Sequence, residues 1–152
     1  MNRILVVALG TIALFAGAAL GGLTTDPATP AAQTKPAPEP LVGATLLDGL
    51  GNYRFPVTSS HPQVQRWFDQ GLMLTFGFNH DAAERSFMKA AELDPGCAMC
   101  WWGAALVLGP HVNSGMDPAR NQDAWARLQR AVALAPKATE RERAFIRALE
   151  AR

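Results

Sequence analysis

The sequence is poor in the residues and patterns that most often carry chemistry. Its 152 residues include only two cysteines and three histidines, and the formal net charge is +1. A chain without a field of one sign is not expected to bind nucleic acid. The sequence also lacks a Ser-His-Asp array, a phosphate-binding glycine loop and a pair of carboxylates at defined spacing. We therefore expect no catalysis by this chain and no cofactor.

The two cysteines, Cys97 and Cys100, are separated by two residues. Trp101 follows them where a c-type haem site requires histidine, so attached haem is not expected. At the start of a helix, an i, i+3 pair can lie within the Cα separation of a disulfide, and a helix N-terminus favours the thiolate form. Two interpretations remain open, a structural disulfide at a tight turn and a redox or metal site.

An apolar run near the N-terminus stands out against this composition. Residues 1–23 combine Arg3 with an unbroken apolar stretch, which predicts either a cleaved export signal or an N-terminal membrane anchor. Ala16-Gly17-Ala18 offers a cleavage site of the small-residue type. No cysteine follows the run, so lipid attachment at a lipobox cysteine is excluded. We expect an exported protein, periplasmic or anchored to the cytoplasmic membrane through this segment alone and facing the periplasm.

The next two segments differ in composition. Residues 24–41 are rich in proline and alanine, which predicts a disordered linker. Residues 42–60 regain large apolar side chains, and Tyr53, Phe55 and Val57 alternate around Pro56. Proline is unfavourable inside a central strand. We therefore expect residues 42–60 to form an extended segment that packs on the folded domain.

Residues 61–95 match the template of a tetratricopeptide (TPR) repeat, W-x2-L-G-x2-Y…A-x3-F…P. The matching residues are Trp67, Gly71, Ala83, Phe87 and Pro95, and the departures are Gln70 and Leu74. A TPR unit is a pair of antiparallel helices that buries its apolar face only by stacking on neighbouring units. One match therefore predicts further repeats.

A second unit spans residues 98–136. Trp101 lies 34 residues after Trp67, and Ala124 and Leu128 have the spacing of Ala83 and Phe87. Residues 109–116 form an insertion between its two helices. Residues 139–152 supply the first helix of an incomplete third unit. The predicted fold is all-α, an α-solenoid of about two and a half TPR hairpins.

Capping residues predict where the helices begin. Ser60 is expected to cap the first helix, Asp81 to start the second, Asp117 to cap the fourth, and Thr139 with Glu142 to form a capping box for the fifth. The inward stripe of the fourth helix is predicted to contain Trp125, Leu128, Ala131 and Leu134.

Two further features concern side-chain placement. Trp101 occupies the core position of its repeat, so Trp102 is expected to fill a neighbouring seam or to line the concave face. Residues 120–152 contain eight Arg or Lys side chains against four acidic ones, which is typical of a solvated helix face.

Several short strings within residues 50–152 resemble a group of exported bacterial TPR-repeat proteins that has no settled biochemical function. The strings are Leu50-Gly51, Phe55-Pro56-Val57, Phe68-Asp69-Gln70-Gly71, Gly77-Phe78-Asn79-His80-Asp81, Asp94-Pro95, Cys97-Ala98-Met99, Trp102-Gly103, Gly109-Pro110 and Arg141-Glu142. The resemblance implies a helical-repeat scaffold and supplies no catalytic residue. Members of this group carry further repeats, so it also favours a fragment of a longer protein or a last helix covered by something else.

The leading functional hypothesis is a scaffold that binds a protein or peptide partner. In a TPR protein, inward residues of the first helix of each repeat line the binding groove. The candidates are Gln70, Met73, Phe76, Cys100, Ala104 and Val107. Self-association through the last helix is a further hypothesis.

The alternative hypothesis is a periplasmic protein that handles thiols or a metal such as copper or zinc. His80 and His111 fall at equivalent turns, which stacked repeats bring together. The Cys97–Cys100 pair lies at the other end of a helix of about 12 residues, about 18 Å away, so one site using all four side chains is not expected. The simpler interpretation places His80 beside a helix cap and His111 in a loop.

Overall fold

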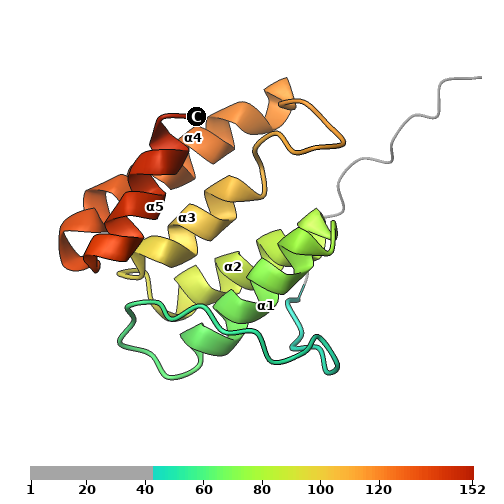
Figure 1. The fold of residues 1–152 in the computed structure, drawn as a ribbon, viewed down its shortest axis with the longest axis vertical. Coiled ribbons are helices and arrows are strands. Elements are labelled where there is room, and N and C mark those ends of the chain that lie inside the picture. The colour runs from blue at the N-terminus through green and yellow to red at the C-terminus, as the bar shows by residue number, and fades with distance from the viewer. Residues whose placement is uncertain (1–42) are drawn as a thin grey trace, which may run out of the picture. The chain divides into compact units, whose positions relative to one another are not determined.

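The computed structural model describes residues 43–152, which form five α-helices and no β-strand (Figure 1). The helices are α1 (Val64–Phe76), α2 (His80–Leu93), α3 (Ala98–Leu106), α4 (Pro118–Leu134) and α5 (Glu140–Glu150), with a 3₁₀ turn, η1, at Ala135–Lys137. The all-α prediction is confirmed for this part of the chain. The predicted export signal or anchor and the linker lie outside the described residues. None of the five helices is long and apolar enough to span a membrane.

The helices pair along the chain. A tight turn joins α1 to α2, and these two helices run antiparallel and pack against each other (Figure 1). The longer loop at residues 107–117 joins α3 to α4, which form a second antiparallel pair. The two pairs meet where α2 packs on α3, and α5 then packs against both α3 and α4.

Phe87 of α2 is the centre at which three helices meet. Its ring packs edge-on against Phe68 of α1 at a centroid distance of 5.3 Å. A Cβ atom added to Gly71 of α1 would come within 2.8 Å of this ring, and one added to Gly103 of α3 within 2.4 Å. Glycine at these two positions lets α1 and α3 approach the same aromatic side chain from two sides.

The cap predictions are confirmed at two helices and wrong at two. Asp117 caps α4 by accepting from the backbone N–H of Ala119, and Thr139 and Glu142 form the predicted capping box of α5. Asn79, rather than Asp81, caps α2 by accepting from the backbone N–H of Ala82.

Ser60 does not cap α1, which begins at Val64 without any side-chain cap. The Ser60 hydroxyl instead donates to the carboxylate of Asp94, 34 residues away in the sequence. The Ser60 side chain therefore bonds to an acceptor that is distant in the sequence, and not to the start of α1 as the local pattern predicts.

The inward stripe of α4 is partly as predicted. Leu128 and Ala131 are buried, whereas 55% of Trp125 is exposed, so the prediction for Trp125 is wrong. On α3, Trp102 is the more buried tryptophan of its pair, and its indole N–H donates to the backbone carbonyl of Phe145 at 3.0 Å. Trp102 thus fills the seam between α3 and α5.

Residues 43–60 have no regular secondary structure and lie along α1 (Figure 1). Side chains of α1 accept from their backbone: the N–H of Leu47 donates to Gln70 Oε1 at 2.7 Å and that of Phe55 to Asp69 Oδ1 at 3.0 Å. The Phe55 ring is buried and reaches across to Phe145 of α5 at a centroid distance of 5.2 Å. This segment therefore contacts both the first and the last described helix.

Candidate functional site

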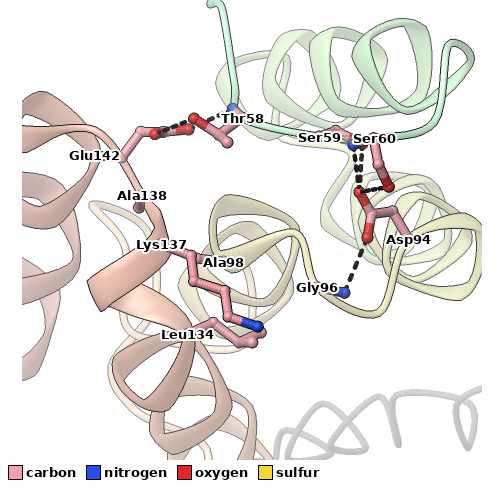
Figure 2. Close-up of a pocket in the computed structure, with 10 residues that line it drawn as sticks. All are labelled: Thr58, Ser59, Ser60, Asp94, Gly96, Ala98, Leu134, Lys137, Ala138 and Glu142. Carbon is pink, nitrogen blue, oxygen red and sulfur yellow. Dashed lines mark hydrogen bonds between the residues drawn. The ribbon is translucent and has the colours of Figure 1, made fainter.

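A cavity of about 200 Å³, lined by both polar and apolar side chains, lies between residues 58–60, the turn after α2 and the start of α5 (Figure 2). Two acidic side chains, Asp94 and Glu142, face it from different elements. Its walls are completed by Thr58, Ser59, Ser60, Gly96, Ala98, Leu134, Lys137 and Ala138. Paired carboxylates in a cavity are candidates for acid–base chemistry, so their hydrogen bonds decide the interpretation.

Both oxygens of Asp94 already accept hydrogen bonds. Oδ2 accepts from the Ser59 hydroxyl at 2.6 Å and from the backbone N–H of Ser60 at 2.8 Å, and Oδ1 accepts from the backbone N–H of Gly96 at 2.9 Å. Burial raises the pKa of Asp94, but these hydrogen bonds outweigh it and leave the pKa below its ordinary value.

Glu142 is held in the same way. Oε1 accepts from the backbone N–H of Thr58 at 2.6 Å, and Oε2 accepts from the hydroxyl groups of Thr58 and Thr139 at 2.7 Å. Burial again raises the pKa of Glu142, and the hydrogen bonds from Thr58 and Thr139 bring it below its ordinary value.

These two carboxylates are suited to holding structure rather than to moving protons. A general acid or base works best with a pKa near the operating pH, and both groups are shifted away from neutrality. Their lone pairs are also directed at donors of the chain itself. Asp94 and Glu142 fasten residues 58–60 to the α2–α3 turn and to α5.

The two cysteines, Cys97 and Cys100, form a disulfide with a Cα–Cα distance of 5.4 Å. Both residues are fully buried, and Cys97 is the N-cap of α3. Exchange with an outside thiol requires access to a sulfur atom. In the observed fold, this burial favours the structural interpretation of the pair over the redox one.

The two candidate metal ligands, His80 and His111, lie side by side as their equivalent positions predicted. Their rings stack with centroids 4.3 Å apart and planes inclined by 14°. Imidazole lone pairs lie in the ring plane, so two stacked rings do not direct them at one ion between them. Among residues 43–152, no three His, Cys, Asp or Glu side chains are grouped so that they could hold a metal ion.

His80 is nevertheless in an unusual environment. Both of its ring nitrogens are buried and have no hydrogen-bond partner. Burial, with smaller contributions from His111 and Arg120, lowers the pKa of His80, and Asp81 opposes the shift. The neutral form of this histidine is therefore favoured in the fold.

The six predicted groove residues do not form one accessible groove. Cys100 and Ala104 are fully buried and Val107 nearly so, so the prediction that they meet a partner is wrong for the observed fold. They face the packed interior because α3 lies between α2, α4 and α5.

The three groove candidates on α1 differ from one another. Gln70 is buried and hydrogen-bonded to the chain itself, since its Nε2 donates to Thr45 O at 2.9 Å and to Ser86 Oγ at 3.0 Å. Residues 43–60 thus cover part of the α1 surface on which the sequence predicts a partner-binding groove. Met73 is half-buried, and Phe76 is 72% exposed.

Sequence reasoning missed an ion triad in which two half-buried arginines of α4 meet the buried Glu84 of α2. Glu84 is only 6% exposed, and its carboxylate accepts from Arg120 and, at 2.7 Å, from Arg127. The count of charges in residues 120–152 predicts a solvated face for Arg120 and Arg127, because such a count carries no information on the direction of a side chain. The spacing of seven residues between the two arginines, which places them on one helix face, was the available signal.

Large apolar side chains are exposed at the turns that carry the two histidines. Phe76 and Phe78 flank the α1–α2 turn, Val112 is in the α3–α4 loop, and 55% of Phe78 and 84% of Val112 are exposed. The ring of Phe78 lies 6.4 Å from that of His111, so the turn and the loop are in contact. We call Phe76, Phe78 and Val112 the apolar rim.

Phe78 also has a left-handed backbone, with φ of 59°. This conformation is rare for a bulky residue and costs on the order of 1 kcal/mol. The surrounding contacts therefore hold an aromatic ring at the surface in spite of local strain.

No protein-family model matches this chain, and neither a curated protein nor a solved structure shows detectable similarity to it.

Proposed function

We propose that this chain is an exported helical-repeat scaffold that binds a protein or peptide partner and performs no catalysis of its own. The observation that carries the proposal is the apolar rim, whose three large side chains are exposed at a turn and a loop that meet through the rings of Phe78 and His111. Exposed apolar side chains in contiguous patches are typical of interaction sites. The carboxylates of Asp94 and Glu142, in contrast, are engaged in hydrogen bonds that hold separate segments together.

The TPR interpretation of the fold is part of this proposal. Two antiparallel hairpins in sequence, and small residues where their helices approach, support it. Ala83 and Phe87 in α2 and their counterparts Ala124 and Leu128 in α4 have the same spacing, and all but Ala124 are buried. In TPR proteins such stacking creates extended binding surfaces.

Export is proposed from the N-terminal sequence and is supported by the disulfide. Residues 1–23 have the composition of a signal or anchor, and disulfides persist mainly in oxidising compartments. A partner would then be met outside the cytoplasm.

A peptide-display selection on the full-length chain tests the binding function. Selected peptides should bind the wild type and lose at least about tenfold in affinity for a Phe76→Ser/Val112→Ser double variant, because truncated anchor residues account for most binding energy. Both side chains are exposed, so the fold should be retained. The measurement is a binding titration by fluorescence anisotropy.

Tyr53→Ser is the matched control, since it removes an aromatic ring that is 52% exposed on the segment before α1. It should leave binding unchanged. Failure to select any peptide, or equal affinity for the wild type and the rim double variant, would contradict the proposal.

A further inference from the structure

The side chain of Gln70 in α1 binds the backbone of residues 43–60 at two points. Its Nε2 donates to the carbonyl of Thr45 at 2.9 Å, and its Oε1 accepts from the N–H of Leu47 at 2.7 Å. Gln70 stands where the TPR template has leucine, and a polar group buried at such a position is costly without hydrogen-bond partners. This carboxamide is therefore suited to binding an extended backbone.

Gln65 repeats the arrangement on the same helix. Its Nε2 donates to the carbonyl of Phe55 at 2.8 Å, and its Oε1 accepts from the N–H of Val57 at 3.2 Å. Asp69 Oδ1 accepts from the N–H of Phe55 at 3.0 Å. At both places a carboxamide bridges a carbonyl and the N–H two residues later, which lie on the same edge of any extended segment. We call Gln65, Asp69 and Gln70 the backbone clamp.

Residues 43–60 are held by side chains of other elements, as a bound peptide would be. None of their backbone groups is bonded to the backbone of another described residue. A cavity of about 520 Å³ is lined by residues 47–54 on one side and by α1 on the other. Leu47 is 49% exposed and Tyr53 52%. The middle of the segment is therefore packed less closely than the parts that the backbone clamp holds.

Phe55 is the only residue of this segment that is buried. Its ring lies between Phe68 and Phe145, with centroids at 6.0 and 5.2 Å. The guanidinium of Arg141 lies 4.2 Å from the centroid of the Phe55 ring, a favourable position over an aromatic face. The site therefore combines backbone recognition with a pocket for one aromatic side chain.

Two hydroxyl groups complete the pattern that the site recognises. Thr58 Oγ1 donates to Glu142 Oε2 at 2.7 Å, and Ser59 Oγ donates to Asp94 Oδ2 at 2.6 Å. These residues follow Phe55 by three and four positions. Hydrogen bonds to a carboxylate are stronger than those between neutral groups, so the two hydroxyls add sequence preference.

We infer that the α1 surface under residues 43–60 is a second peptide-binding site, occupied in the observed fold by the chain's own segment. The partner is an extended segment of another protein, with an aromatic residue followed three and four positions later by Thr or Ser. Residues 43–60 compete with this partner and so inhibit its binding. The site shares no residue with the apolar rim, so the inference goes beyond the proposed function and can fail separately from it.

Competition within one chain sets the expected affinities. A tethered occupant acts at an effective concentration of about millimolar. A free peptide of the same sequence should therefore bind the wild type weakly. It should bind more tightly when residues 43–60 of the chain are altered so that they occupy the site less well.

A titration with the free segment tests the inference. The probe is a fluorescent peptide with the sequence of residues 43–60, added to the full-length chain and followed by fluorescence anisotropy. The Phe55→Ala chain should bind it at least about tenfold more tightly than the wild type, because its own segment has lost the aromatic anchor. Leu47→Pro removes the N–H that Gln70 binds and leaves the buried ring in place, and it should tighten binding at least about threefold.

Changes in the probe and in the clamp make the test specific. A Phe55→Ala peptide should bind the Phe55→Ala chain at least about tenfold more weakly than the wild-type peptide, whereas a Tyr53→Ala peptide should bind it equally well. Adding Gln70→Leu to the Phe55→Ala chain should weaken binding of the wild-type peptide at least about fivefold. Gln63→Leu, the matched control, changes an exposed residue outside the backbone clamp and should have no effect.

Circular dichroism checks that each variant is folded, and the Leu47→Pro chain carries the test if Phe55→Ala unfolds the domain. The inference is wrong if neither variant binds the peptide up to on the order of 100 μM, if the Phe55→Ala peptide binds as well as the wild-type peptide, or if Gln70→Leu has no effect. A wild-type dimer that the peptide dissociates would also overturn it, because two copies would then exchange residues 43–60. Intact peptide binding at the apolar rim would leave the proposed function standing in each case.

Discussion

At the scale of the residue, the most informative groups are the two carboxylates that tie separate elements together. The pKa values of Asp94 and Glu142 are both below their ordinary values in the fold. A carboxylate with a depressed pKa stabilises the folded state when the pH is above the unfolded value. That stability is lost as the pH falls through the lowered pKa. These two groups therefore make the domain sensitive to acid.

Replacing Glu142 by Gln should show this directly. The substitution puts an amide NH₂ where the buried Glu142 Oε2 accepts from Thr58 and Thr139, so these partly buried donors lose an acceptor. We expect a loss of about 2 kcal/mol in the free energy of unfolding at pH 7. The loss should shrink as the pH falls below the ordinary glutamate pKa of about 4.3 and on through the lowered pKa of Glu142, because the wild-type carboxylate is progressively protonated over that range.

Urea denaturation at several pH values measures both effects. Glu140→Gln is the matched control, because Glu140 is exposed and its partners are the nearby Arg143 and Arg147 on the same helix. It should change stability little. A Glu142→Gln variant whose destabilisation is the same at pH 7 and pH 3 would show that the carboxylate charge is not the cause.

At the scale of the element, the helix packing depends on two glycines that face one ring. An alanine at Gly103 would place its Cβ 2.4 Å from the Phe87 ring, and one at Gly71 2.8 Å from it. Alanine favours a helix over glycine by about 1 kcal/mol. Overpacking costs about 1–3 kcal/mol, so the clash should outweigh the gain.

We expect Gly103→Ala to be destabilising by about 1–2 kcal/mol and Gly71→Ala by less, measured by urea denaturation. Combining Gly103→Ala with Phe87→Leu should cost less than the sum of the two single changes, because a smaller side chain makes room for the methyl group. Gly115→Ala, in open space, is the control and should be nearly neutral. Additive effects in the double variant would argue against a shared contact.

The elements also show what sequence alone could establish. Helices α4 and α5 begin where Asp117 and Thr139 predicted, because each cap side chain and the backbone N–H that donates to it lie within the same turn. The expectation for Ser60 is wrong because its hydroxyl bonds to Asp94, and a local pattern holds no information about that long-range partner. The expectation for Asp81 is wrong for another reason. Asn79, two residues earlier, is an equally good capping residue and caps α2 instead.

The candidate site was predictable only in part. The predicted equivalence of the α1–α2 turn and the α3–α4 loop placed His80 and His111 near each other, and in the fold their rings stack. The same equivalence could not show that Cys100 and Ala104 are buried, because that depends on how deeply α3 packs between its neighbours. Trp125 was assigned to the core by its helical spacing, yet whether it is covered depends on a neighbouring helix.

At the scale of the whole molecule, residues 43–60 link parts of the fold that are distant in sequence. Thr58 bonds to Glu142 of α5, whereas Ser59 and Ser60 bond to Asp94 after α2. Phe55 packs between α1 and α5, with Phe68 at 6.0 Å on one side and Phe145 at 5.2 Å on the other.

This linking role predicts an uneven response to the loss of Phe55. Deleting a buried aromatic side chain costs about 3–5 kcal/mol in a rigid core, and Phe55→Ala should approach the lower end because the segment can relax. Helix α5 should open most, since its contact with α1 passes through this ring, while α1 and α2 keep their shared core around Phe87. Hydrogen exchange by mass spectrometry should therefore show faster exchange in α5 peptides than in α2 peptides.

The control for this last prediction is Tyr53→Ala, two residues earlier on the same segment and half exposed, which should leave exchange in α5 unchanged. Uniformly faster exchange in α1, α2 and α5 after Phe55→Ala would mean that the domain opens as one cooperative unit. In that case residues 43–60 would be part of a single core. Selective opening of α5 would instead mean that this segment sets the local stability of α5, separately from the core that α1 and α2 share around Phe87.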